Sequence, residues 1–537
     1  MLPGSRPALG RLSAGLSAGL SAAARPRPLV RRRSGVSRPE GCRIIVATPT
    51  AHPSAPSEPS EPTTDDDRVK QTFPLHEPAH DEPHPLPPRG LVVAILIAVV
   101  AAVAAGLGRA DGTARADFVL PVVAAIGVGL AWLAFTRFDL FVVAILAARA
   151  SLDALKLGSA GATGGGAFDP AAMLSVAFLF AGLLWMSAQS REPLAPTSPI
   201  VKPMAALVVA GAVSVVLSPN VSGAAVDVMK LATVAVILVV LNQLFTSVRP
   251  VRLVLGAVVI SSLVPMAAAV YQFLTGTGLH DSGDFSRVQG TFTHPNPFAI
   301  YLTLLMVMGA AVLRYLSPGR KLVLLLFMGG WGGCMLLTYT RSAWLATIAG
   351  ILTVGLYQGK KAIAIFGLVL IGVLFLVPST AARFADLERD QTVSGAAGNS
   401  LVWRIDYWKQ AIDLNQDPLL GNGLRSVRES TDEAKEPHND FIRVFVEMGL
   451  IGLIAYVWFA VTLWRTGTRA IHNTRDGLFR GIAVGFFGCV VAFLLLSIVS
   501  NVITQLAIFW YFAAFAAAAV AAPRLAPVDE LDLAPAR

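Results

Sequence analysis

Long apolar runs separated by short polar segments fill this chain from about residue 90 to residue 522. A run of about 20 apolar residues crosses the hydrocarbon core of a bilayer as one helix. The pattern predicts about fourteen such helices, near residues 91–108, 118–135, 138–156, 171–188, 203–217, 227–246, 253–274, 295–314, 322–339, 343–357, 362–378, 441–464, 481–500 and 505–522. We therefore expect an all-α, polytopic membrane helical bundle of about 12–14 transmembrane helices. The short fifth and tenth runs leave open a re-entrant or tilted segment.

Composition places the chain among membrane proteins. It is 54% hydrophobic and only 14% charged, with a mean hydropathy of +0.63. These values are too apolar for a soluble domain. The net charge of +9 would suggest a nucleic-acid partner in a soluble protein, but the bilayer is the expected partner here and nucleic acid is not.

The basic residues recur in every second loop, as the positive-inside rule expects of cytoplasmic loops. These loops carry Arg137; Arg191 and Lys202; Arg249 and Arg252; Arg314, Arg320 and Lys321; Lys360 and Lys361; Arg465, Arg469 and Arg475; and Arg524. We therefore expect a multi-pass protein of the cytoplasmic membrane with both termini in the cytoplasm. Segments 275–294, 340–342 and 379–440 would then lie outside.

The predicted domain organisation is simple. Residues 1–89 are rich in Pro, Ser, Arg and Ala, so we expect a disordered cytoplasmic tail that cannot bury a core. Residues 90–522 form the transmembrane domain, and 523–537 form a second cytoplasmic tail. The chain has three cysteines, and their placement indicates neither a disulfide framework nor a metal cluster.

The outer segment 379–440 contains its own helical pattern. Trp403, Tyr407, Trp408, Ala411 and Ile412 recur at roughly helical spacing, which predicts an amphipathic helix against the membrane interface. Breakers follow this pattern, namely Asp417-Pro418 and Gly421-Asn422-Gly423. The expected loop is therefore long, extracytoplasmic and partly helical.

His438 is the strongest candidate for chemistry. It lies in Pro437-His438-Asn439-Asp440, between the outer loop and a predicted helix. A histidine can move protons near neutral pH. The N-terminal end of the following helix would tend to keep its imidazole neutral, so that it could act as a general base. The alternative is a structural histidine that caps the helix or binds the loop.

Two arginines are predicted on the same side of the membrane as His438. Arg287 precedes a predicted helix, and Arg341 lies between two apolar runs with almost no loop. Because a guanidinium is costly within the bilayer, we expect Arg341 at the outer interface or facing a watery cavity. Two planar guanidinium groups could clamp a pyrophosphate. The alternative for Arg341 is that it extends to lipid headgroups.

Four further polar residues, Asn439, Glu447, His294 and Asn296, are candidates for supporting roles. Asn439, Arg443 and Glu447 follow at four-residue intervals and share one helix face. The simplest explanation for a carboxylate at Glu447 is that it pairs with Arg443. The functional alternative is that Glu447 orients the site. His294 and Asn296 flank Pro295, which together with Pro297 indicates a bent helix start.

These motifs together resemble the O-antigen ligase and O-antigen polymerase superfamily. The residues that carry the resemblance span roughly 270–465: Arg287 with Gly290-Thr291-Phe292-Thr293-His294-Pro295-Asn296; Thr340-Arg341-Ser342-Ala343-Trp344; Arg404 with Trp408; Gly421-Asn422-Gly423; and His438-Asn439-Asp440-Phe441 leading to Glu447-Met448-Gly449-Leu450-Ile451-Gly452. Two features depart from the family pattern: the fourteen predicted spans exceed the usual twelve or so, and the long N-terminal tail has no family role.

The resemblance implies a metal-independent, inverting glycosyltransferase on the outer face of the cytoplasmic membrane. Its donor would be a glycan linked to undecaprenyl diphosphate, and its acceptor a hydroxyl of a glycan, lipid or protein. It also implies that His438 activates that hydroxyl, while Arg287 and Arg341 bind the leaving diphosphate. Ligase and polymerase activities both fit, and no cofactor or metal is expected.

Two other functions stay open on the sequence alone. One is a lipid-phosphate-sugar glycosyltransferase that uses an aspartate of the first outer loop, with Asp111 and Asp117 as candidates. The other is a multi-span solute transporter, which should show broken helices and ionisable residues at the bilayer midplane. Walker, dinucleotide-binding and zinc-site spacings are all missing from the sequence.

Overall fold

The structure is a computed structural model that describes residues 115–152, 170–188, 198–280, 286–359, 400–431 and 435–526. All of them belong to the unit Asp81–Arg537, which is separate from a unit formed by Met1–His80. The predicted tail at 1–89 and the predicted spans at 91–108 and 362–378 lie outside the described residues. Asp111 does as well, and Asp117 is described only as part of the backbone of a helix.

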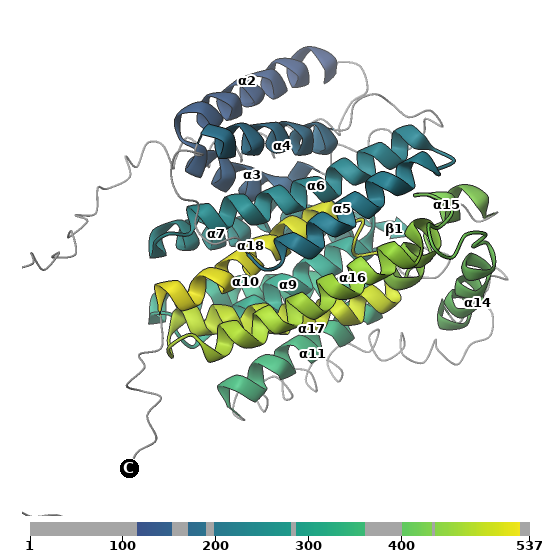
Figure 1. The fold of residues 1–537 in the computed structure, drawn as a ribbon. Coiled ribbons are helices and arrows are strands. Elements are labelled where there is room, and N and C mark those ends of the chain that lie inside the picture. Colours follow the sequence, from purple (N-terminus) through teal and green to yellow (C-terminus); the bar gives the residue numbers. More distant parts are fainter. Residues whose placement is uncertain are drawn as a thin grey trace, which may run out of the picture. The chain divides into compact units, whose positions relative to one another are not determined.

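The described residues form a helical bundle, which confirms the predicted all-α fold (Figure 1). Its helices are α2 Arg115–Thr136, α3 Phe138–Leu152, α4 Pro170–Ala188, α5 Val201–Val216, α6 Val221–Leu244, α7 Val248–Ile260, α8 Leu263–Thr275, α9 Pro295–Leu313, α10 Pro318–Leu337, α11 Arg341–Gln358, α14 Ser400–Asp413, α15 Ser426–Ser430, α16 Asp440–His472, α17 Leu478–Val499 and α18 Leu506–Leu525. One small hairpin pairs β1 Leu279–His280 with β2 Ser286–Arg287.

Seven of the described helical segments are long and apolar enough to cross a membrane. They are Val221–Leu244, Val248–Thr275, Pro295–Leu313, Pro318–Leu337, Asp440–His472, Leu478–Val499 and Leu506–Leu525. Each overlaps one of the predicted spans. The chain is therefore a multi-pass membrane protein, as its apolar pattern indicates.

The described loops alternate between two ends of the bundle in the order that the sequence predicts. At one end, Arg425 contacts Asp227 near the start of α6, and Ile503 before α18 contacts Asp440 at the start of α16. At the other end, Tyr315 after α9 donates to Asp476 before α17. Figure 1 shows α14, α15 and β1 together at the first of these ends. We refer to it as the loop end.

The centre of the bundle is formed by α9, α17 and α18. In an apolar 18-residue stretch of α18, 89% of the residues are buried, compared with 22% in the corresponding stretch of α10. Small residues permit close approach where α11 crosses α17, because a Cβ on Gly350 would lie 2.6 Å from Val307 and 3.1 Å from the carbonyl oxygen of Gly488. Such small-residue contacts are typical of membrane helix packing. They place α11, which begins at Arg341, firmly against the core.

A break divides α16 into two helices at Gly449, whose φ of 63° and ψ of −165° are not helical. Residues 417–424 pack against this break: the amide of Leu450 donates to the carbonyl of Pro418 at 2.9 Å, and that of Gly423 to the carbonyl of Glu447 at 3.1 Å. Leu450–His472 alone would be about 34 Å long at 1.5 Å per residue, which is enough to span a bilayer. Asp440–Met448 is therefore a short helix at the loop end that carries the charged residues Asp440, Arg443 and Glu447.

The predicted span at 253–274 is confirmed as the apolar segment Val248–Thr275. Within it, α7 ends at Ile260 and α8 begins at Leu263, after Ser261 and Ser262. The amphipathic helix is confirmed as α14, but its Tyr407 and Ala411 are buried against Val427 and Val446 of α15 and α16. Its aromatic face thus packs on protein, where the sequence predicted the membrane interface.

Candidate functional site

His438 lies in a short segment that α14 holds against the start of α16. Its φ of 52° is a left-handed conformation that non-glycine residues seldom adopt. Trp408 Nε1 donates to the carbonyl of Pro437 at 2.6 Å, and the hydroxyl of Tyr407 donates to the carbonyl of Lys435, also at 2.6 Å. The ring of His438 lies 6.1 Å from that of Trp403. These neighbours constrain the segment on the side facing α14.

The imidazole of His438 is neutral at physiological pH. Burial is the main cause that lowers its pKa to about 4, and electrostatic interactions with Arg404, His294 and Lys435 lower it further. The sequence predicted a neutral ring because of the helix N-terminus, whereas burial and neighbouring cations are the causes in the structure. A neutral imidazole can accept a proton.

Asn439, and not His438, caps α16. Its side-chain oxygen accepts from the amide of Ile442 at 3.1 Å, which leaves the imidazole of His438 uninvolved in that cap. The next residue, Asp440, is fully buried and accepts from the amides of Val502 and Ile503 at 3.2 Å each. The backbone that follows His438 is therefore anchored to the segment before α18.

Arg287 is buried between β2 and the turn that precedes α11. Its Nε donates to the carbonyl of Thr338 at 2.9 Å, and one Nη donates to Thr340 Oγ1 at 3.1 Å. The same Nη donates to Asn296 Oδ1 at 2.9 Å. Thr340 is the N-cap residue of α11, which starts at Arg341. The structure thus brings Arg287, Asn296 and the first turn of α11 together.

His294 is the N-cap of α9, where its Nδ1 accepts from the amide of Asn296 at 3.1 Å. Pro295 occupies the first turn of that helix, as the sequence predicts. His294 is half-buried and interacts electrostatically with His438. It therefore combines a structural role with a place beside the candidate base.

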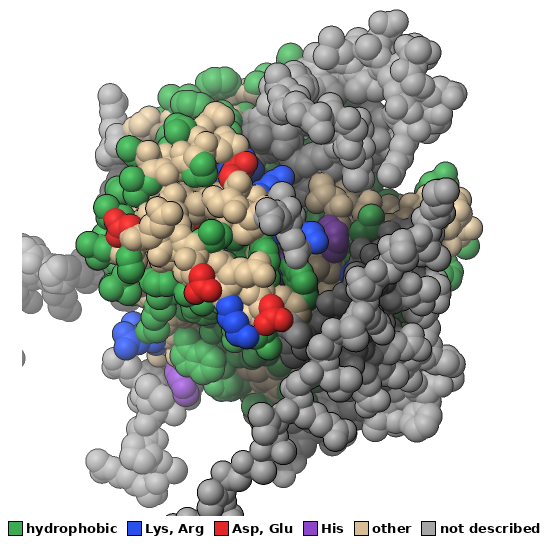
Figure 2. Space-filling model, turned by 90° about the vertical axis from the view of Figure 1, so that its right-hand side faces the viewer, with side chains coloured by type: hydrophobic (Ala, Val, Ile, Leu, Met, Phe, Trp, Pro, Cys, Tyr) green, Lys and Arg blue, Asp and Glu red, His purple; other side chains and the backbone are tan. Residues whose placement is uncertain are grey.

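Arg404 is the member of this site that the sequence reasoning missed. It projects from α14, and burial, followed by the positive charges of Arg341 and Arg287, lowers its pKa. Arg404 in turn acts on His438, so electrostatic interactions link Arg404 to both arginines and to the histidine. We call Arg287, Arg341, Arg404 and His438 the cationic site. Figure 2 faces this end and shows a histidine beside lysine or arginine side chains in a recess.

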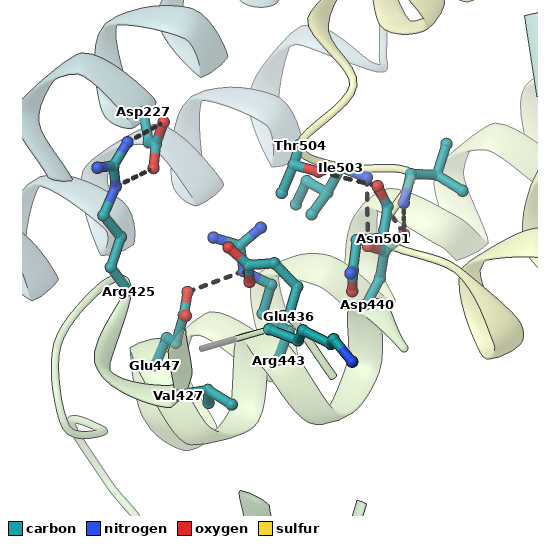
Figure 3. Close-up of polar contacts among 12 residues, drawn as sticks. Asp227, Arg425, Val427, Glu436, Asp440, Arg443, Glu447, Asn501, Ile503 and Thr504 are labelled. Carbon is teal, nitrogen blue, oxygen red and sulfur yellow. Dashed lines mark hydrogen bonds and ion pairs between the residues drawn. The ribbon is translucent and has the colours of Figure 1, made fainter. Parts of the chain in front are cut away.

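A second charged group includes Arg443 and Glu447 of α16 (Figure 3). Arg443 Nε donates to Glu447 Oε2 at 2.9 Å and lies 3.1 Å from Glu436 Oε2. Arg425 contacts Asp227 through Nε at 2.7 Å. We call these five residues the mixed-charge cluster. The predicted pair of Arg443 with Glu447 is present, and it joins two further carboxylates that the spacing did not indicate.

The two groups differ in the chemistry they permit. In the cationic site, the charges that act on Arg404 and His438 are positive, which favours an anionic ligand beside a neutral proton acceptor. In the mixed-charge cluster, carboxylates and guanidinium groups alternate. Its ions compensate one another, as buried charges require.

One family model matches the part of the chain that contains most of the cationic site. Residues 322–457 match the family model of O-antigen ligase. No curated protein matches the chain significantly. The matched segment runs from α10 to α16 and includes Arg341, Arg404 and His438, while Arg287 precedes it. The match confirms the resemblance to the O-antigen ligase and O-antigen polymerase superfamily, and at family level it indicates a glycan-transferring membrane enzyme.

Proposed function

We propose that this protein transfers a glycan from an undecaprenyl-diphosphate carrier to an acceptor hydroxyl on the outer face of the cytoplasmic membrane. His438 is the general base. Arg287, Arg341 and Arg404 bind the diphosphate of the donor. The observation that supports the proposal is that Arg404 of α14 interacts electrostatically with Arg287 of β2, with Arg341 at the start of α11 and with the neutral His438.

The reaction that fits these residues is a single displacement with inversion. The acceptor oxygen attacks the anomeric carbon, the bond from that carbon to the diphosphate breaks, and its electron pair goes to the departing phosphate oxygen. His438 takes the proton of the acceptor hydroxyl and later releases it to water. The diphosphate already carries its charge in the ground state, and the arginines stabilise the additional charge that develops as it leaves.

The arginines can also stabilise the leaving diphosphate without a metal ion. Each guanidinium offers planar donors that match phosphate oxygens. Asn296, Thr338 and Thr340 hold Arg287 in place with neutral oxygens, so its positive charge is not cancelled by these contacts. A preorganised cation of this kind is more effective than one that must reorient during the reaction.

The test is an assay of donor consumption by the full-length protein in membranes, with and without EDTA. We expect EDTA to have no effect. His438→Ala should lower turnover by about a hundred- to ten-thousand-fold, the range of general-base catalysis. The matched control is His472→Ala, at the far end of α16, which should retain wild-type turnover. Normal turnover by His438→Ala would end the assignment.

The transporter alternative is less well supported. One of its expected features is present, because α16 is broken at Gly449. The break, however, precedes a full-length span, and the ionisable residues Asp440, Arg443 and Glu447 all lie on the short helix before it. They are therefore placed at the loop end of the bundle, whereas a transporter would hold them near the midplane.

A further inference from the structure

Gln272 is a buried polar residue in the largely apolar helix α8. It lies near the end of that helix, within the membrane-spanning segment Val248–Thr275. Gln272 is 1% exposed, whereas its neighbours Tyr271 and Phe273 are 60% and 57% exposed. A polar group inside a membrane-spanning segment is costly without partners, so its presence there points to a function. The proposed reaction assigns no role to this residue.

Three hydrogen bonds join the side chain of Gln272 to the backbone of two consecutive residues. Its Oε1 accepts from the amides of Gln289 and Gly290 at 2.9 Å each. Its Nε2 donates to the carbonyl of Gly290 at 2.8 Å. Both the acceptor and the donor of the side-chain amide are therefore used on one piece of backbone, which we call the Gln289-Gly290 turn.

The Gln289-Gly290 turn packs directly on the backbone of α8. Gly290 has a φ of 60°, a left-handed conformation that favours glycine. A Cβ at this position would lie 2.8 Å from the carbonyl oxygen of Pro265, in the first turn of α8. The close approach and the hydrogen bonds of Gln272 thus hold the turn against the same helix.

The turn held by Gln272 lies between two residues of the candidate site. Arg287 precedes the turn by two positions, and His294 follows it by four. The guanidinium of Arg287 donates to Asn296 on α9 and to the carbonyl of Thr338 at the end of α10. Gln272 adds a support from a third helix, α8, and this support acts on the backbone beside Arg287.

We propose that Gln272 is a positioning residue for Arg287, an inference that rests on the proposed function. It acts through the Gln289-Gly290 turn, because its hydrogen bonds go to that backbone. Stabilisation of a departing diphosphate requires a guanidinium that is already in place. A displacement of about 1 Å caused by a substitution away from the chemistry can cost about a hundredfold in rate. Gln272 should therefore contribute to kcat although it carries no charge.

The first test is hydrogen–deuterium exchange of the full-length protein in detergent, read on peptides that contain residues 288–292. Gln272→Met keeps an unbranched side chain and removes all three hydrogen bonds. The amides of Gln289 and Gly290 should then exchange about tenfold faster, because they have lost their acceptor. Unchanged exchange at these two amides would show that Gln272 does not hold the turn, and would overturn the proposal.

Two further variants separate this role from general stability. Thr233 on α6 is also 1% exposed and accepts from Trp510 Nε1 at 3.1 Å. Thr233→Val is therefore a matched loss of a buried acceptor, and it should leave the exchange of residues 288–292 and kcat unchanged. Gln272→Glu retains an acceptor for both amides, so it should exchange more slowly there than Gln272→Met. Equal exchange in the two Gln272 variants would contradict the assigned hydrogen bonds.

Kinetics then test whether the turn matters through Arg287. With folded protein quantified by size-exclusion chromatography, Gln272→Met should lower kcat by about ten- to a hundredfold. In an Arg287→Gln background, the same substitution should have almost no further effect, because the guanidinium that Gln272 positions is missing. A structural defect unrelated to Arg287 would instead lower kcat by the same factor in both backgrounds. That result would overturn the proposal.

Failure of this inference can be distinguished from failure of the proposed function. If Gln272→Met speeds exchange in the turn but leaves kcat unchanged, Gln272 supports the fold alone and the inference fails. If His438→Ala transfers glycan normally while Gln272→Met lowers kcat only when Arg287 is present, the assignment of the base fails. In that case the positioning role of Gln272 stands.

Discussion

The cationic site and the mixed-charge cluster lie on neighbouring elements, but their charges are compensated in different ways. In the cationic site, burial is the main cause that lowers the pKa of Arg404 and of His438; Arg341 and Arg287 lower the pKa of Arg404 further, and Arg404 does the same for His438. In the mixed-charge cluster, Arg443 lies between Glu436 and Glu447. The first therefore gains stability when an anion binds, whereas the second is stable with its own partners. Substitutions should affect activity in one and folding in the other.

The largest expected effect is on the mixed-charge cluster. Arg443→Ala leaves two buried carboxylates without their shared cation, and breaking a buried pair of this kind costs about 3–5 kcal/mol. Thermal unfolding in detergent should show a strongly destabilised protein, while Lys409→Ala on α14 should unfold as wild type does. An unchanged unfolding temperature for Arg443→Ala would show that the two regions do not differ as described.

The next effect is on catalysis by the cationic site. Arg341→Gln removes a charge proposed to stabilise the leaving diphosphate, and loss of one such preorganised group costs about 2.7–4 kcal/mol of transition-state stabilisation, or a hundred- to thousandfold in kcat. Arg341→Lys should recover only part of this, because lysine lacks the planar fork. Steady-state kinetics on folded protein, checked by size-exclusion chromatography, measure both. Equal rates for the two variants would refute a role for the guanidinium geometry.

A smaller effect should appear in the pH dependence. His438 must be neutral to accept a proton, so the acid limb of kcat/KM should lie near its pKa of about 4. Arg404→Gln removes a positive charge that disfavours the imidazolium, and the limb should therefore move upward, toward 6.5. In wild type, the limb of kcat should lie above that of kcat/KM, because bound diphosphate offsets the same cations. An acid limb at the same pH in Arg404→Gln and in wild type would show that Arg404 does not influence the protonation of His438.

The smallest effect should be at the exposed pair of Lys409 with Asp406 on α14, whose side chains are 70% and 58% exposed. Asp406→Asn should change the free energy of unfolding by at most about 1 kcal/mol, because solvent screens such pairs. Salt should reduce even this difference. If Asp406→Asn lowered the free energy of unfolding as much as Arg443→Ala does, burial would not be what makes the ion pairs of the mixed-charge cluster stronger than exposed pairs.

Much of the fold follows from hydropathy alone. Each of the seven spanning segments overlaps a predicted run, because burial in lipid demands length and apolarity whatever the neighbouring helices are. The breaks were not predictable in the same way. Gly449 and Ser261 lie inside continuous apolar patterns, and the break at Gly449 is held by residues 417–424, whose approach depends on tertiary packing.

The candidate site shows the same division between local and distant relationships. The pair of Arg443 with Glu447 follows from four-residue spacing on one helix face, and the cap of α9 at His294 follows from the adjacent prolines. The contact of Arg425 with Asp227 joins residues 198 positions apart, and no spacing rule indicates it. Arg404 stands on a helix predicted to face the membrane, and although it is among the residues that carry the family resemblance, no local pattern places it beside His438.

The helix break at Gly449 also bears on how the protein enters the bilayer. Insertion machinery responds to the hydrophobicity of a segment long enough to span, and Leu450 is the first residue of such a segment. Asp440, Arg443 and Glu447 precede it, so they lie outside the segment that must insert as an apolar helix. The charged groups of the loop end can then assemble after insertion, when Tyr456 of the inserted span donates to Asp440.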